Sequence, residues 1–232
     1  AVFGTTGEAN SFSVDEKINA LDFLINNHIP SKKLLPGTGL CSIRDTVKFT
    51  KKCSELNVRA VLVLPAFFYK GVSDEGVIDY YRRVVEEVGD ENLHYILYHI
   101  PQTSGVAISF EVIEKLTKMY PNNIVGMKDS SGDLDNMLKI TKLFDNFSLF
   151  SGSDSLALKV CKRGGAGAIT ATSNISGKLF ISVAAGTTVE QIQSALVKNN
   201  MTSLAPVVRV MPNTPSQLGL GISGLYASNE VS

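Results

Sequence analysis

Lys128 is the residue of this sequence best placed to do chemistry. It follows a short apolar run, Ile124–Met127, and small polar residues come directly after it in Asp129–Gly132. We therefore expect the amine of Lys128 at the carboxyl end of a buried strand, where α/β folds place their functional groups. A surrounding of low dielectric favours the neutral, nucleophilic form of an amine. The alternative is a surface lysine that only closes a strand.

Residues able to bind or react follow nearly every other apolar run as well. Because the carboxyl ends of parallel strands meet at one end of a barrel, such groups would converge on one site in a (β/α)8 fold. An open dinucleotide-binding sheet is disfavoured, since no G-x-G-x-x-G follows the first apolar run. The groups are Thr5–Glu8, Gly37–Gly39, Phe67–Tyr69, Tyr98–Pro101, Lys128–Asp129, Gly152–Asp154 and Thr172–Asn174.

The elements that position these groups alternate between strand-like and helical patterns. A capping box, Ser13–Glu16, opens the first helical pattern, and Ser73 is a candidate N-cap for a later helix. This alternation predicts an α/β protein with a parallel sheet. The expected strands are Ala1–Phe3, Leu34–Leu35, Ala60–Leu64, Tyr95–Ile100, Ile124–Met127, Phe147–Phe150 and Ala166–Ala171, and further helices are expected at Phe110–Met119, Leu134–Leu143 and Ser155–Arg163.

Composition excludes several classes of function. The 232 residues are 44% hydrophobic and carry no net charge, so nothing indicates a nucleic-acid surface. Cys41, Cys53 and Cys161 are scattered without a C-x-x-C spacing, which disfavours a metal site or a disulfide framework and fits the cytoplasm. There is no apolar run long enough to span a membrane and no signal peptide. Ala1–Phe3 looks like a strand already under way, so we expect an N-terminal piece to be missing.

The alternation changes after the last of these runs. Leu179–Ala184 has a strand pattern but follows too closely to be the next parallel strand of a barrel. A helix is predicted from Val189 to Lys198, and a further strand at Val207–Met211 that Pro212 ends.

The motifs at the strand ends of residues 1–178 resemble those of the dihydrodipicolinate synthase/N-acetylneuraminate lyase family. The matching stretches are Gly4–Glu8, Tyr98–Pro101 with Gly105, Gly126–Gly132, Gly152–Asp154 and Gly165–Ile169. The resemblance implies a (β/α)8 barrel that handles pyruvate as a class I aldolase, without a cofactor. It also implies that the first strand and helix of the barrel are lacking here.

The segment 179–232 resembles instead a fragment of pyrroline-5-carboxylate reductase. The matching stretches are Ile181–Gly186, Val208–Pro215 and Gly219–Gly221. We therefore expect two domains, an aldolase-type barrel over 1–178 and a reductase-like β-α-β extension over 179–232 that packs on the barrel or completes it. One hypothesis is that Val207–Met211 replaces the missing first strand beside Val2 and Phe3.

The resemblance assigns Lys128 to a Schiff base with a 2-keto acid such as pyruvate. An iminium is an electron sink that allows reversible carbon–carbon bond formation at the neighbouring carbon. Tyr98 is then the proton carrier, and Thr5 links it to a proton relay. The alternative for Tyr98 is an aromatic residue that caps the barrel core, and for Thr5 it is ordinary turn chemistry.

Three further residues have roles that only the resemblance implies. Thr6 would bind the carboxylate of the keto acid, and the backbone of Ile169 would contact the same molecule. Tyr69 would reach the active site of a neighbouring subunit, which implies a homo-oligomer, a dimer or a tetramer. On their own, Thr6 reads as a turn residue, Ile169 as core and Tyr69 as a loop aromatic.

Two positions depart from the family pattern. His99 stands where asparagine is common, and a packed or hydrogen-bonded histidine is expected there rather than a catalyst. Thr103 stands where dihydrodipicolinate synthases carry an arginine that holds the aldehyde's carboxylate. A threonine cannot make that bidentate contact, which leaves room for a sugar-derived substrate.

The sequence thus favours a Schiff-base aldolase or synthase that joins pyruvate to an aldehyde or cleaves such a product. The partners expected are small molecules, with no nucleic acid, membrane or metal. Two alternatives remain: a catalytically impaired fusion or truncated product, and a pyrroline-5-carboxylate reductase, which the missing nucleotide-binding motif disfavours.

Overall fold

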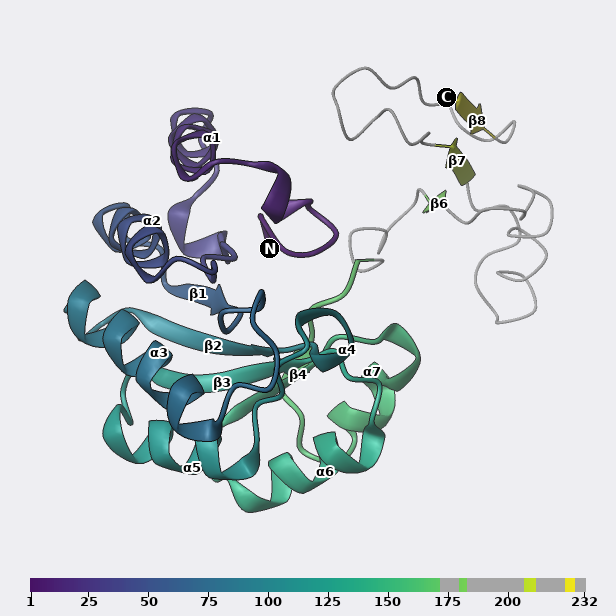
Figure 1. Ribbon diagram of the computed structural model, residues 1–232. Helices are drawn as coiled ribbons and strands as arrows, with labels where there is room; N and C mark the ends of the chain where they lie inside the picture. Colours follow the sequence, from purple (N-terminus) through teal and green to yellow (C-terminus); the bar gives the residue numbers. More distant parts are fainter. Residues whose placement is uncertain (172–179, 183–206, 212–223, 228–232) are drawn as a thin grey trace. The chain divides into compact units, whose positions relative to one another are not determined.

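The computed structural model describes residues 1–171, 180–182, 207–211 and 224–227. The chain divides into two compact units, Ala1–Thr170 and Ala171–Ser232 (Figure 1). Each unit is described by itself. The predicted boundary between residues 178 and 179 stays a prediction.

The first unit is built on a parallel sheet in which the strands follow one another in chain order. Its strands are β1 (Ala60–Val63), β2 (His94–His99), β3 (Ile124–Asp129), β4 (Ser148–Ser151) and β5 (Gly167–Ala168). All pairings between neighbours are parallel. The predicted α/β class with alternating strands and helices is therefore confirmed.

Two extended segments continue this sheet beyond β1 through single bridges. Gly37 pairs with Leu62 of β1, and Pro36 pairs with Val2, both in the parallel sense. The bridges rest on a few backbone hydrogen bonds, such as those from Leu62 N–H to Pro36 O (2.8 Å) and from Gly37 N–H to Val2 O (2.8 Å). Val2 forms its bridge within the predicted strand Ala1–Phe3, whereas the second segment pairs through Pro36 and Gly37, just beyond the predicted Leu34–Leu35.

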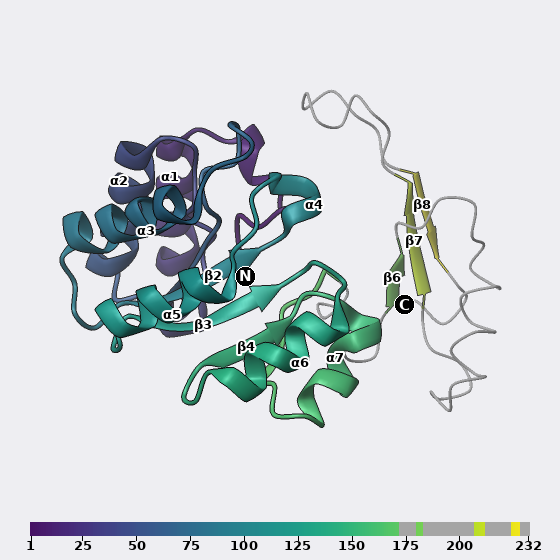
Figure 2. The ribbon, with the colours of Figure 1, turned by 60° about the horizontal axis from the view of Figure 1, so that its bottom comes forward.

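Helices connect successive strands and cover one face of the sheet (Figures 1 and 2). Most begin at a serine or aspartate whose side chain accepts a backbone N–H of the first turn, and the predicted capping box of Ser13 and Glu16 is present. The helices are α1 (Val14–Asn26), α2 (Ile43–Glu55), α3 (Asp74–Val88), α4 (Pro101–Ser104), α5 (Phe110–Met119), α6 (Leu134–Leu143) and α7 (Asp154–Cys161), with 3-10 turns at Ala9–Ser11 and Ser31–Lys33.

The strands divide their side chains between two faces. Tyr95 and Leu97 of β2 and Met127 of β3 belong to the large core beneath the helices. Ile96 and Tyr98 belong to a smaller cluster on the opposite face. Because successive residues of a strand point to opposite sides, the same register that sends Tyr98 to one face sends His99 to the helix-covered face.

His99 and Asp129 are a buried polar pair on that helix-covered side. They are partners in the register of β2 and β3, and they are 6% and 0% exposed. His99 Nδ1 accepts the N–H of Ile108 at 3.1 Å, which makes it a packed, hydrogen-bonded residue as predicted. Burial disfavours the imidazolium and lowers the pKa of His99, while Asp129 and Asp133 oppose this shift.

The second unit contains a three-stranded sheet of β6 (Phe180–Ser182), β7 (Val207–Met211) and β8 (Gly224–Ala227). β7 pairs with β6 in the parallel sense and with β8 in the antiparallel sense. Both edges of β7 are therefore occupied, so the hypothesis that Val207–Met211 pairs beside Val2 and Phe3 is wrong. The helix predicted from Val189 to Lys198 lies outside the described residues.

Among the helices that the structure describes, none is both long and apolar enough to cross a membrane.

A substitution at Gly126 tests whether stability depends on the close approach of β3 and β4. A Cβ on Gly126 would lie 2.3 Å from the carbonyl oxygen of Ser148, so Gly126→Ala must push the two strands apart. We expect it to lower the free energy of unfolding by about 1–3 kcal/mol. Urea denaturation measures this. Gly7→Ala is the matched control, since its Cβ would meet its nearest atom at 3.4 Å. Equal unfolding midpoints for the two variants would contradict the argument.

His99 predicts a dependence of stability on pH. Its pKa is lowered on folding, so the unfolded chain binds a proton at higher pH than the folded one. The stability that neutral His99 provides is complete above about pH 6.5 and is lost as the pH falls toward the lowered folded pKa. His99→Asn keeps an acceptor for the Ile108 N–H, and should flatten the urea midpoint between about pH 7 and about pH 5. His28→Asn, at an exposed position, should keep the parent's slope. Parallel slopes for His99→Asn and the parent would refute the assignment.

Candidate functional site

Lys128, Tyr98 and Thr5 meet at the carboxyl ends of the strands. Tyr98 and Lys128 are partners in the register of β2 and β3, so their side chains emerge side by side on the same face. The Lys128 Nζ lies 4.2 Å from the centroid of the Tyr98 ring. The Tyr98 hydroxyl and the Thr5 Oγ1 share a hydrogen bond of 3.0 Å. The structure therefore brings together a primary amine, a phenol and an alcohol.

Burial differs between these three groups. Tyr98 is 5% exposed, Lys128 is half-buried and Thr5 is exposed. The hydroxyl of Tyr98 is hydrogen-bonded to the exposed Thr5, and the ring of Tyr98 lies beneath the half-buried Lys128.

The remaining predicted site residues lie on the same rim but do not join this contact. Thr6 is exposed on the turn that also carries Thr5. Ile169 follows β5 and is half-buried, and its N–H donates to Ser151 O at 2.9 Å. Tyr69 is 78% exposed on the loop after β1, where its ring stands edge-on to Phe68. Within the described residues, no hydrogen bond joins Thr6, Ile169 or Tyr69 to Lys128 or Tyr98.

Asp129 is a supporting residue to which the sequence alone gave no separate role. Its carboxylate is fully buried and accepts the N–H of Ser131 and the amide of Asn136, both at 2.8 Å. Its carbonyl accepts the N–H of Gly152 at 2.6 Å. These bonds fix the end of β3 to α6 and to the loop after β4, and so hold the backbone on which Lys128 stands. The pattern of an aspartate before Ser-Ser-Gly indicates such a turn.

Short α4 supplies a second support, which sequence reasoning also missed. Gln102 donates its side-chain amide to Ser130 O at 2.6 Å, linking α4 to the loop after Lys128. Thr103, next to it, is exposed. Ser104 is buried, and its carbonyl receives the ammonium of Lys70 at 2.6 Å. Contacts of this kind join loops that are distant in sequence, and a local motif does not predict them.

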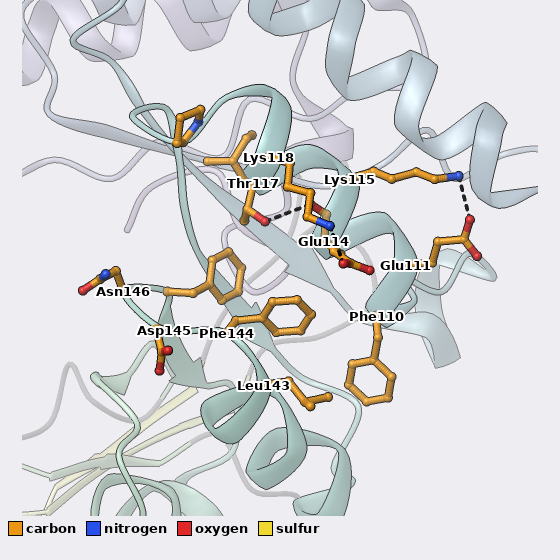
Figure 3. A pocket seen from close by; sticks show the side chains of 13 residues that line it. Phe110, Glu111, Glu114, Lys115, Thr117, Lys118, Leu143, Phe144, Asp145 and Asn146 are labelled. Carbon is orange, nitrogen blue, oxygen red and sulfur yellow. Dashed lines mark hydrogen bonds and ion pairs between the residues drawn. The ribbon is translucent and has the colours of Figure 1, made fainter.

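A hollow of about 920 Å³ lies apart from these residues, between α5 and the segment that follows α6 (Figure 3). Phe110, Leu143 and Phe144 line it, together with two ion pairs along α5, Glu111–Lys115 at 2.6 Å and Glu114–Lys118 at 2.5 Å. None of the predicted site residues lines this hollow. In the portion of the chain that the structure describes, no group of three or more His, Cys, Asp or Glu side chains could hold a metal ion.

Comparison with known proteins finds similar lyases and synthases. An uncharacterized DapA-like lyase from Chloroflexus aurantiacus is 35% identical over 176 residues, which are 76% of this chain and 58% of that protein. The 4-hydroxy-tetrahydrodipicolinate synthase of Listeria welshimeri is 39% identical over 179 residues, 76% of this chain and 59% of the enzyme. The chain thus spans about three fifths of the length of these curated relatives.

Solved structures show the same similarity. Dihydrodipicolinate synthase from Agrobacterium tumefaciens superposes with a TM-score of 0.72 at 27% identity, over 75% of this chain and 61% of that one. The synthase from Aquifex aeolicus gives a TM-score of 0.69 at 30% identity, over 75% and 58% of the two chains. The 2-keto 3-deoxygluconate aldolase of Picrophilus torridus shares the fold, with a TM-score of 0.68 at 24% identity over 85% of this chain and 66% of that one.

The family assignment rests on a longer match than the motifs alone. The model of the dihydrodipicolinate synthetase family matches residues 1–222, and so extends well into the second unit. The resemblance of 179–232 to pyrroline-5-carboxylate reductase stays a prediction. With both the matched length and the relatives in agreement, the chain belongs to the dihydrodipicolinate synthetase family.

Proposed function

We propose that this chain is a Schiff-base-forming aldolase or synthase that joins pyruvate or another 2-keto acid to an aldehyde, or cleaves such a product. The observation that carries the proposal is the contact of the Lys128 amine with the Tyr98 ring, whose hydroxyl is bonded to Thr5. Membership of the dihydrodipicolinate synthetase family and the names of the synthase relatives support it.

The first chemical step needs a neutral amine beside a proton carrier. Lys128 attacks the ketone carbon, a carbon–nitrogen bond forms, and the oxygen leaves as water to give an iminium. Loss of a proton from the neighbouring carbon yields an enamine, which attacks the aldehyde carbon to form the new carbon–carbon bond. Cleavage runs through the same steps in reverse.

Tyr98 is the group placed to move protons in these steps. Its hydroxyl is attached to the ring that contacts Lys128. The hydrogen bond of 3.0 Å to Thr5 gives this phenol a partner with which to exchange a proton. A phenol positioned in this way can both donate and accept one proton. Thr5 connects it to the solvent side of the site.

The keto acid's carboxylate needs hydrogen-bond donors close to Lys128. Thr6 is one residue beyond Thr5 on the exposed turn and offers a hydroxyl and a backbone N–H. On the opposite margin of the sheet, the backbone after β5 at Ile169 would contact the same molecule. Both assignments are part of the proposal.

Thr103 bears on the choice of aldehyde. It is an exposed, uncharged residue on α4, at the position where the family resemblance leads us to expect an arginine. A neutral hydroxyl can hydrogen-bond to the hydroxyl groups of a sugar-derived 2-keto acid. It cannot make the charged, bidentate contact with a substrate carboxylate that an arginine makes. We therefore propose a lyase of a sugar-derived 2-keto acid as a second candidate beside a dihydrodipicolinate synthase-like activity.

A homo-oligomer, a dimer or a tetramer, is part of the same proposal. Phe68 and Tyr69 are 71% and 78% exposed, and their rings are 5.2 Å apart. Large aromatic side chains that are exposed next to one another are typical of a surface that contacts another protein subunit. A cytoplasmic location, expected from the scattered cysteines, stays a prediction.

Borohydride reduction in the presence of pyruvate tests the Schiff base directly. The parent should gain a covalent adduct that peptide mass spectrometry locates at Lys128, because borohydride reduces an iminium to a stable amine. Lys128→Ala should gain none. Lys139→Ala, on the exposed side of α6, should label like the parent. An adduct that persists in Lys128→Ala would place the Schiff base elsewhere.

Tyr98→Phe tests the proton carrier. It keeps the ring beneath Lys128 but removes the hydroxyl bonded to Thr5, so kcat should fall by about 10²-fold or more. Thr5→Val should fall in the same direction, and the double variant should be little worse than Tyr98→Phe, because the two residues act as one unit. Tyr120→Phe, which loses only a hydrogen bond to Glu86, serves as control. Fully additive losses would count against a shared relay.

A further inference from the structure

Lys70 makes a contact that the proposed chemistry does not use. It ends the loop Phe67–Lys70, which follows β1, and its ammonium donates to the carbonyl of Phe67 and to the carbonyl of Ser104. Ser104 belongs to α4, the short helix that follows β2. One side chain therefore closes its own loop and ties that loop to the neighbouring one.

Neutral partners distinguish Lys70 from other lysines of this surface. Lys48, Lys52, Lys115 and Lys118 each pair with a carboxylate. Lys70 instead donates to two backbone carbonyls, to which no opposite charge draws it. Charged donors form stronger hydrogen bonds than neutral ones, and the ammonium of the exposed Lys70 makes two such bonds.

The aliphatic part of Lys70 lies close against Gly105. Gly105 has a φ of +68°, and a Cβ built on it would lie 2.4 Å from Lys70 Cδ and 2.8 Å from Lys70 Cε. The lysine stem thus passes over the face of Gly105 where any other residue would have a side chain. Gly105 serves two needs, since only glycine adopts this φ easily and leaves the passage open.

The acceptor end of the contact is itself rigid. Ser104 is 1% exposed, its hydroxyl has the carbonyls of Ile100 (3.0 Å) and Val106 (2.9 Å) within donating distance, and it accepts the N–H of Val106 at 3.1 Å. α4 is tied in turn to the loop after Lys128 through Gln102. The Lys70 ammonium therefore fastens a projecting loop to a fixed part of the site.

The loop that is fastened carries Phe68 and Tyr69. Both side chains project from the stretch between the Phe67 carbonyl and Lys70, the two ends that the ammonium joins. Thr103 lies next to Ser104 on the other side of the contact. The proposed function gives Thr103, on α4, a role on the aldehyde side and gives Tyr69, on the fastened loop, a role at the subunit contact.

We propose that Lys70 is a positioning residue that clamps the loop of Tyr69 to α4 and so fixes the aldehyde side of the site. This inference rests on the proposed function. The role of Lys70 would concern the aldehyde step and not the formation of the Schiff base, because Lys70 does not touch Lys128 or Tyr98. Loss of the clamp should leave formation of the pyruvate adduct intact and impair use of the aldehyde.

The kinetic test uses Lys70→Met, which keeps an unbranched stem and removes the donors. With pyruvate and either glyceraldehyde or aspartate semialdehyde, kcat/KM for the aldehyde should fall about tenfold or more, through misplacement of the groups that hold it. Borohydride trapping with pyruvate alone should match the parent. Lys70→Arg, which can donate to both carbonyls, should recover most of the loss. Lys142→Met, at an exposed position of α6, is the matched control.

Chymotrypsin provides a readout that does not depend on activity. It cleaves after exposed aromatic residues, and release of the loop in Lys70→Met should speed cleavage after Phe68 and Tyr69 severalfold, as followed by mass spectrometry of the fragments. Gly105→Ala, which displaces the lysine stem, should show the same acceleration, and the double variant should be no faster than either. Unchanged cleavage in Lys70→Met would overturn the clamp.

Different results would contradict the proposed function and the role of Lys70. A parent that forms no pyruvate adduct counts against the proposed function, and with it against any role of Lys70 in the reaction. A parent that forms the adduct, while Lys70→Met keeps the aldehyde kinetics of the Lys142→Met control, counts against Lys70 alone. A fall in trapping as large as the fall in aldehyde use would show general disruption and would also overturn the assignment.

Discussion

The pairing of β2 with β3 is the constraint on which the rest of the site depends. Their parallel register sets Tyr98 opposite Lys128 and, one residue on, His99 opposite Asp129. Because side chains alternate along a strand, this single register separates two kinds of chemistry. The amine and the phenol face the open side, while the imidazole and the carboxylate are buried beneath the helices. A slip of one residue would exchange them.

Supports around the register come from the end of β3 and from the loops. The buried carboxylate of Asp129 ties the end of β3 to α6, Gln102 joins α4 to the next loop, and Lys70 joins the loop after β1 to α4. The last two bonds connect the carboxyl ends of neighbouring strands. The strands fix where the reactive groups emerge, and these lateral bonds fix the walls around them. Parallel α/β proteins generally divide labour in this way, with a rigid sheet beneath variable loops.

Much of this arrangement could be predicted from the sequence. The seven apolar runs of the first unit lie in the predicted order, and the strand-end position of Lys128 followed from Ile124–Met127 alone. The link between Thr5 and Tyr98 was expected only through the family resemblance, because the residues are far apart in the chain. The Lys70 contact could not be predicted, because its acceptors are backbone carbonyls, which every residue has whatever its type. The placement of Val207–Met211 beside Val2 was wrong. A strand pattern in the sequence does not show which strand it will pair with, and both edges of Val207–Met211 are paired, with β6 and with β8.

The single bridges at Val2 and Gly37 give the site an uneven stability. Thr5 stands three residues beyond Val2, and that segment is joined to the sheet by one bridge, whereas Tyr98 and Lys128 stand on fully paired strands. Local opening requires little free energy where few backbone bonds must break, and nearly the whole unfolding free energy where many must. On warming, the Thr5 hydroxyl should therefore detach from Tyr98 while Lys128 and Tyr98 keep their places. Within the described part of the first unit, the hydrogen bond between Thr5 and Tyr98 is then lost at temperatures where the sheet is still intact.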